Sequence, residues 1–151
     1  MGTSQLLVHN TCNAVRKARG YTFTLNQNGR PTEIHVKKLK LYGKHKRPGA
    51  QEKALVRDLQ PDDHYGHFAG HQFNAPAAHY NLTGQNSWAN EYQDSPWWQM
   101  EERWRQQLLI KPDSVEVTWE ITYPPGSHRP SSVKFIQIID GVERVDEYNR
   151  W

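Results

Sequence analysis

Apolar and polar residues alternate along three segments of the chain with the two-residue period of a half-buried β-strand. In YTFTLNQNGRPTEIHVKKLKL, residues 21–41, the alternation runs on both sides of an Asn-Gly pair at 28–29, which predicts a β-hairpin. VEVTWEITY, residues 115–123, alternates strictly, and VKFIQII, residues 133–139, follows it after a turn rich in Pro. These segments predict antiparallel strands that bury one face.

The period changes to that of an α-helix in WWQMEERWRQQLLI, residues 97–110. Ser95-Pro96 precedes this segment, and a serine N-cap followed by proline in the first turn favours a helix start. Lys111-Pro112 ends it. The residues that share one face at helical spacing are Trp97, Met100 or Glu101, Trp104 and Leu108. We expect this face to be buried, with at least one of the two adjacent tryptophans in the core.

Between the first hairpin and this helix, residues 51–90 show neither period, and Gly, Pro, Asn and His are spread through them. We expect this segment to be irregular. A long polar segment of this kind inside a compact domain is usually functional or mobile. The order of hairpin, irregular segment, helix and hairpin predicts an α+β fold with antiparallel strands.

Composition restricts the class of protein. A chain of 151 residues is most simply one domain, and six Trp and seven Tyr argue against disorder because these side chains bury large areas. Cys12 is the only cysteine, so neither an internal disulfide nor a cysteine-based zinc site is expected. No apolar run is long enough for a membrane span, and the first ten residues do not read as a secretory signal.

Charge is distributed unequally along the chain. Residues 1–57 carry twelve Lys or Arg and two acids, a net of +10, whereas residues 58–151 carry seven basic and fourteen acidic side chains, a net of -7. The densest basic stretch consists of Lys37, Lys38, Lys40, Lys44, Lys46, Arg47, Lys53 and Arg57. Such a stretch suits a nucleic acid, because neutralised phosphates release counterions. The alternative is a solvated strand face and loop without a partner.

Imidazole and carboxamide side chains are crowded into residues 62–90, and three explanations compete for them. His64, His67 and His71 could hold zinc on a helix, although two glycines among them argue against a helix. The polar residues could satisfy loop backbone through Asx turns. The third explanation is phosphodiester hydrolysis, in which a neutral His activates water and oxygen ligands hold a hydrated hard cation.

Several short motifs occur in a fixed order along the same part of the chain. They are Gly66-His67, the N-L-T-G-Q box at 81–85, Asn90, and the W-x-x-x-E-x-x-x-R series of Trp97, Glu101 and Arg105. This order resembles the DNA/RNA non-specific endonucleases of the ββα-metal (His-Me finger) superfamily. An N-G-R-P hairpin at 28–31 and a Y-x(5)-R-P stretch at 123–130 resemble the toxin-associated branch of that family.

The match has three departures from the family pattern. Gly84 stands where the N-L-x-P-Q box has Pro, and Tyr65 stands where the family often has Arg before Gly-His. The spacing between Asn90 and Glu101 is longer than in the best-known member.

The resemblance implies a ββα-metal fold and a role for each matching residue. His67 would be the general base, active in its neutral form, and Asn90 would bind Mg²⁺, or Mn²⁺ as the alternative ion. Glu101 would orient the waters of the metal, Asn81 would brace the site, and Arg105 would contact the phosphate. The implied substrate is DNA, RNA or both, and the basic stretch from Lys37 to Arg57 would supply the binding surface.

The segment LLVHNTC, residues 6–12, resembles the end of a self-cleaving intein-like domain, as found upstream of toxin domains in Rhs-like and contact-dependent polymorphic toxins. On this reading, residues 1–12 are a junction and residues 13–151 are a delivered nuclease toxin domain. It would act in the cytoplasm of a target bacterium and would require an acidic immunity protein, with no membrane partner. The competing hypotheses are an ordinary linker, a non-catalytic nucleic-acid-binding module and a zinc-dependent hydrolase.

Overall fold

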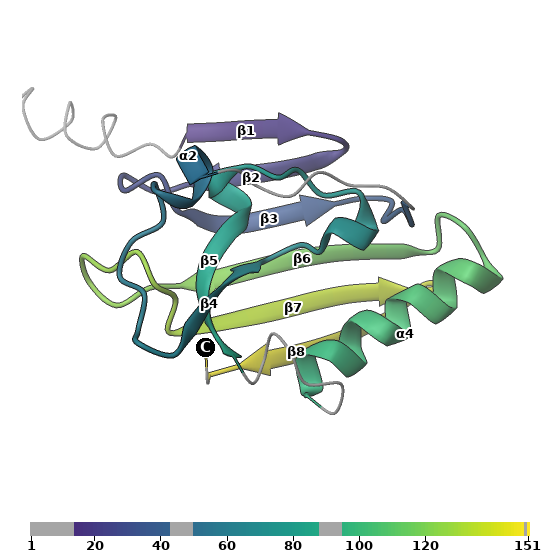
Figure 1. Cartoon of the computed structure of the whole chain (residues 1–151). Helices are drawn as coiled ribbons and strands as arrows, with labels where there is room; N and C mark the ends of the chain where they lie inside the picture. Colours follow the sequence, from purple (N-terminus) through teal and green to yellow (C-terminus); the bar gives the residue numbers. More distant parts are fainter. Residues whose placement is uncertain (1–13, 43–49, 88–94, 150) are drawn as a thin grey trace, which may run out of the picture.

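The computed structural model describes residues 14–42, 50–87, 95–149 and 151. Its largest element is a six-stranded antiparallel sheet in the order β1-β2-β3-β6-β7-β8 (Figure 1). The strands of this sheet are β1 (Ala14–Ala18), β2 (Tyr21–Leu25), β3 (Pro31–Val36), β6 (Val115–Thr122), β7 (Ser132–Ile139) and β8 (Val142–Tyr148).

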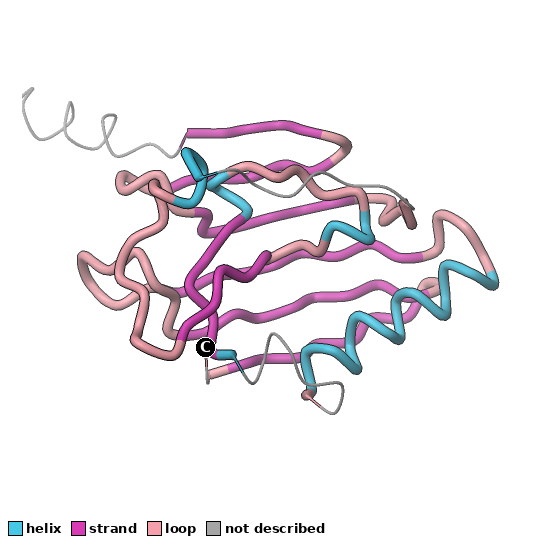
Figure 2. Tube along the Cα trace, in the orientation of Figure 1, coloured by secondary structure: helices cyan, strands magenta, loops and turns pink. Residues whose placement is uncertain are grey.

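A second, two-stranded antiparallel sheet consists of β4 (Asp63–His67) and β5 (Leu82–Asn86). The helical elements are α2 (Ala50–Lys53), the 3-10 turns η1 (His71–Phe73) and η2 (His79–Asn81), and the long helix α4 (Pro96–Ile110). Figure 2 shows the mixture of strands and helices, and among the described residues no helix is both long and apolar enough to cross a bilayer.

Both α4 and the β4–β5 hairpin pack on the same face of the six-stranded sheet. The indole of Trp119 on β6 donates a 2.9 Å hydrogen bond to the carbonyl of Phe68, just after β4. The indole of Trp104 on α4 donates at 2.8 Å to the Oε1 atom of Gln137 on β7. Trp119 and Gln137 are fully buried and belong to strands that pair directly, so the helix and the hairpin share one aromatic core.

The structure confirms the periodic segments. The hairpin predicted in 21–41 forms as β2 and β3, although β3 ends at Val36, so the strand period predicted through Leu41 was wrong for residues 37–41. Its turn is closed by Gly29 at φ 72° and by the Asn26 side chain, which accepts hydrogen bonds from the amides of Asn28 and Arg30. The segments 115–123 and 133–139 form β6 and β7.

The predicted helix forms as α4, with the Ser95 hydroxyl accepting a hydrogen bond from the amide of Trp98 at 3.1 Å. Its buried residues are Trp97, Met100, Trp104 and Leu108, as the spacing predicted. Trp98 is 40% exposed, so only the first of the two adjacent tryptophans enters the core. The α+β class is therefore confirmed.

Two kinds of strand were missed, for different reasons. β1 and β8 are the edge strands of the large sheet, and most of their residues are exposed and charged or small, which leaves no apolar alternation to detect. The prediction that residues 51–90 are irregular was wrong for β4 and β5. Their sequences, DHYGH and LTGQN, each contain a glycine in place of a patterned apolar residue.

Close packing explains the glycine in β4. A Cβ atom on Gly66 would lie 2.1 Å from Oε1 of Gln85 on β5, so no other residue fits without movement of the pair. Close contact between β4 and β5 therefore favours glycine at this position, and a method based on hydrophobic periodicity cannot predict such a pair of strands.

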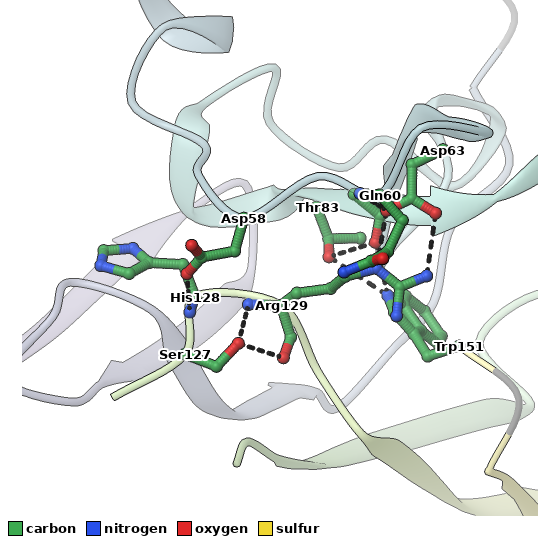
Figure 3. A network of polar contacts seen from close by, with 9 residues as sticks. Asp58, Gln60, Asp63, Thr83, Ser127, His128, Arg129 and Trp151 are labelled. Atoms are coloured by element: carbon green, nitrogen blue, oxygen red, sulfur yellow. Dashed lines mark hydrogen bonds and ion pairs between the residues drawn. The ribbon is translucent and has the colours of Figure 1, made fainter. Parts of the chain in front are cut away.

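Polar clamps fasten this small hairpin to the rest of the molecule. The guanidinium of Arg129, in the loop between β6 and β7, makes two hydrogen bonds to the carboxylate of Asp63, at 2.6 and 2.8 Å (Figure 3). On β5, the indole of Trp151 donates a 2.8 Å hydrogen bond to the carbonyl of Gly84. The backbone carbonyl of Trp151 accepts a 2.9 Å hydrogen bond from the amide of Asn86. Both strands are held from segments far away in the chain.

We predict that Arg129→Ala destabilises the protein by about 3–5 kcal/mol, because it leaves the Asp63 carboxylate, whose side chain is 2% exposed, without its counter-charge. Urea unfolding at neutral pH measures the change. Arg144→Ala, which removes a half-exposed guanidinium from the surface, is the matched control and should change stability by less than about 1 kcal/mol.

The same variant should show a defined pH dependence. Burial alone would raise the pKa of Asp63, but hydrogen bonds from Arg129 and from the amide of Gln60 outweigh it and hold the pKa below its usual range. A depressed carboxyl pKa stabilises the fold above the unfolded-state pKa and ceases to do so as pH falls through the folded-state value. The deficit of Arg129→Ala should therefore shrink in acid, and a deficit that is constant with pH would contradict this role for the pair.

Candidate active site

His67 is the last residue of β4, and its cross-strand partner is Leu82, the first residue of β5. The side chain is partly exposed. Immediately after it, the amide of Phe68 donates a 3.0 Å hydrogen bond to the carbonyl of Asn81. His67 therefore stands at the loop end of a short, paired hairpin, with its side chain partly exposed.

The ring of His71 lies against that of His67, with 4.0 Å between the centroids and 61° between the ring planes. His64 lies on the opposite face of β4 from His67, because successive strand residues alternate. No three His, Cys, Asp or Glu side chains within the described ranges converge as a metal-binding group. The zinc hypothesis for His64, His67 and His71 is wrong, because it required a helix where the chain forms a strand.

Asn81 is fully buried and makes three hydrogen bonds through its side chain. Its Oδ1 accepts from the amide of Ala69 at 3.0 Å, and its Nδ2 donates to the carbonyls of Ala69 and Pro76 at 2.9 and 3.0 Å. The carboxamide thus joins the two ends of the loop that separates β4 from β5. This geometry is that of a brace for the segment beside His67.

Glu101 lies on α4 and faces the same loop. A Cβ atom on Gly70 would be 3.2 Å from Oε2 of Glu101, so the glycine leaves room for the carboxylate to approach the backbone. Gly70 is next to His71, and the ring of His71 contacts that of His67, so the carboxylate of α4 and the imidazole of β4 approach the same loop segment, residues 70–71.

The electrostatics of Glu101 follow from its burial. Burial raises the pKa of Glu101 to about 8, and a hydrogen bond from Trp97 opposes this rise. Trp97 precedes Glu101 by one helical turn, so the two side chains lie on the same face of α4. The W-x-x-x-E motif therefore places an indole donor beside a carboxyl group at the edge of the aromatic core.

Arg105 follows Glu101 by one more turn of α4. Its side chain is 43% exposed, and its Nε is 3.7 Å from the carboxylate of Glu102. An exposed contact at this distance contributes little energy, so the guanidinium keeps its donors available to another partner.

The described members of the predicted nucleic-acid-binding set lie at two places. Lys37 and Lys40 are exposed but are paired with Glu116 and Asp113, and Asp113 also lies near Lys38. Arg57 is exposed at a different place, beside the β2–β3 turn. Asn90, Lys44, Lys46 and Arg47 lie outside the described residues.

Three contacts of the structure were not found from the sequence. The ammonium of Lys53 lies 5.5 Å from the ring centroid of Tyr65, which supplies a cation beside β4 where the family pattern would have Arg. Arg129 of the Y-x(5)-R-P stretch binds Asp63, and Arg30 of the N-G-R-P hairpin binds backbone carbonyls near β5. The sequence motifs drew attention to these two arginines, but the groups that they bind could be identified only from the fold.

A family model described as DNA/RNA non-specific endonuclease matches residues 10–141. The chain belongs to this family. A solved structure described as an extracellular endonuclease is similar in fold, with a TM-score of 0.52 and 16% sequence identity, over 92% of this chain and 70% of that chain. The likeness agrees with the ββα-metal arrangement that the β4–β5 hairpin and α4 display, and family membership supports nuclease activity.

We predict that Trp97→Phe raises the pKa of Glu101 above about 8 in metal-free protein, because it removes the indole donor and keeps an aromatic ring. An NMR titration of ¹³C-labelled glutamate carboxyls measures this, with Glu101→Gln to assign the resonance. Trp98→Phe is the matched control on the exposed side of α4, and an equal shift in both variants would refute the contact.

We predict that Asn81→Ala lowers stability by on the order of 2–4 kcal/mol, because buried partners at Ala69 and Pro76 lose their hydrogen bonds. Thermal or urea unfolding measures the loss. Asn149→Ala, at an exposed carboxamide, should be neutral. If Asn81→Ala kept full stability and lost only turnover, Asn81 would act on the substrate and not as a brace.

Proposed function

We propose that the chain is a metal-dependent, sequence-nonspecific endonuclease that hydrolyses phosphodiester bonds of DNA, of RNA or of both. The observation that carries the proposal is the convergence of an imidazole from β4 and a carboxyl group from α4 around Gly70 and His71. These residues match the family motifs in order and belong to different elements of the fold.

In this proposal, His67 is the general base. It lies at the end of β4 with a partly exposed side chain, and its neutral form takes a proton from the attacking water. Activity should therefore fall as acid protonates the imidazole. The edge-on contact with His71 restricts the rotation of the ring, so that the basic nitrogen is held in one direction.

The residues beside His67 fit a hard, mostly hydrated cation. The carboxyl group of Glu101 approaches the backbone at Gly70, and desolvation raises its pKa to about 8. The proposed ligand set is Asn90 directly and Glu101 through ordered water, a small oxygen set that suits Mg²⁺ or Mn²⁺. When bound, such an ion stabilises the charge that develops on the phosphate and on the leaving 3′ oxygen.

Arg105 is the proposed phosphate contact on α4. It lies one turn beyond Glu101, and its weak contact with Glu102 leaves the planar fork of donors able to bind two phosphate oxygens. Lys53, held over Tyr65, adds a second cation on the β4 side of His67.

A delivered toxin is the proposed biological setting. The support for it is in the sequence, in the LLVHNTC segment at 6–12 and in the motifs that resemble the toxin-associated branch. The nuclease domain, residues 13–151, would then act in the cytoplasm of a target bacterium. An acidic immunity protein would protect the producing cell, with association accelerated by opposite charge.

We predict that His67→Ala reduces plasmid cleavage by at least about a hundredfold without loss of folding, because the water loses its base. EDTA should abolish cleavage by the unchanged protein. The matched control is His35→Ala, which removes an imidazole that is bound to Glu116 on the opposite face of the large sheet and should leave cleavage unchanged. Supercoiled plasmid and total RNA are both tested with Mg²⁺ and with Mn²⁺.

Full activity in His67→Ala would overturn the assignment of the base. Metal-independent, salt-sensitive binding without cleavage of either substrate would instead favour the non-catalytic binding module.

A further inference from the structure

A polar cavity of about 330 Å³ lies next to the β2–β3 turn, outside the site around His67. The residues of this cavity that matter here are Asn28, Arg30, Arg57, His79 and His128. We call it the turn cavity. None of the residues that line it is acidic, which makes it unusual on a chain that carries 16 Asp and Glu.

The first observation is a buried charge without a counter-charge. Arg30 is 1% exposed, and its guanidinium donates to the carbonyls of His79, at 3.0 Å, and of Leu82. Its other described partner is the Tyr123 hydroxyl, and its buried Nε has no hydrogen-bond partner among the described residues. Buried charges are normally paired with an opposite charge, so Arg30 imposes an uncompensated positive potential on the turn cavity.

The second observation is a set of available donors around the same cavity. Arg57 is exposed and forms no ion pair with a described residue. The buried Nδ1 of His128 also makes no hydrogen bond within the described part of the chain. The nearby acids are already engaged, since Glu52 accepts from the backbone and ring of His79 and Asp58 accepts from the amide of His128.

The third observation connects the turn cavity to the active site. His79 begins η2, which leads directly into β5, and Arg30 binds carbonyls at both ends of that step. Leu82 is the cross-strand partner of His67. Directly paired residues of antiparallel strands have Cα atoms about 4.5–5.5 Å apart. Arg30, which lines the turn cavity, therefore binds the backbone of the residue that is paired with His67.

We propose that the turn cavity is a phosphate-binding subsite that holds the backbone of the same nucleic-acid strand a few nucleotides away from the scissile phosphate. The choice of ligand rests on the proposed function. Arg57 and His128 contact the phosphate oxygens. The positive charge of Arg30 strengthens both contacts, because Arg30 is buried and its charge is poorly screened by water. The contact is to the backbone and is therefore independent of base sequence.

Fluorescence anisotropy with a labelled 12-nucleotide single strand tests the subsite. The measurement uses His67→Ala protein in EDTA, so that no cleavage occurs. Adding Arg57→Glu and His128→Ala should raise Kd at least tenfold and reduce the salt dependence of log Kd by about 0.7 for the phosphate contact that is lost. The control is Lys134→Glu, which makes the same charge change on the opposite face of the sheet. At equal salt concentration it should alter Kd less than twofold.

Substrate length supplies the second readout. In cleavage assays with intact His67, Arg57→Glu should reduce kcat/KM at least fivefold more for a 12-nucleotide strand than for a dinucleotide, mainly through KM. Circular dichroism and the melting temperature establish that each variant is folded. A Kd that is unchanged by Arg57→Glu and His128→Ala, or an equal loss for both lengths, would overturn the subsite.

The subsite and the proposed function fail separately. Loss of cleavage in His67→Ala together with no effect of the cavity variants would remove the subsite and leave the nuclease. An Arg57-dependent Kd in a protein that cleaves neither DNA nor RNA would keep the subsite and remove the catalytic proposal.

Discussion

The structure depends on how a short polar hairpin is held against an aromatic core. β4 and β5 have five residues each, contain a glycine each, and present few apolar side chains with which to pack. A two-stranded hairpin of this kind is marginal on its own in water. Directional contacts therefore fix it: a buried ion pair at Asp63, backbone capture by Trp151, and the donation of Arg30 to carbonyls at β5. The position of His67 follows from these contacts.

In the proposed site, the residues that would react are different from the residues that hold the fold in place. Asn81 and Arg30 make all of their described hydrogen bonds inside the protein, to backbone carbonyls and amides or to Tyr123. Their effect on chemistry is indirect, since they set the path of the loop between His67 and β5. Conversely, Arg105 has only a weak contact with its neighbour Glu102, which is the condition of a side chain that is available to a ligand.

The parts of the fold that were predictable from sequence are those whose energy comes from apolar burial at a regular period. That holds for β2, β3, β6, β7 and α4, whose inward residues are buried in strict order. The edge strands were missed because exposure removes the pattern, and β4 and β5 because hydrogen bonds and glycine packing specify them. In the candidate site, the roles of His67, Glu101 and Arg105 remain predictions from the motif order. The contacts of His71 with His67 and of Lys53 with Tyr65 could not be predicted from sequence spacing.

Charge shows the same limit of linear sequence in another form. The densest basic stretch of the chain includes Lys37 and Lys40, yet the fold brings Glu116 and Asp113 from the acidic half beside them. A cross-strand row on the exposed face of the sheet consists of Glu33, Glu120, Lys134 and Glu147. Three of these four side chains are acidic, and only Lys134 is basic. The positive potential therefore does not follow the count of lysines. Beside the turn cavity, the buried guanidinium of Arg30 has no carboxylate partner among the described residues, although Glu52 and Asp58 are hydrogen-bonded nearby. A polyanion that enters this cavity meets that charge.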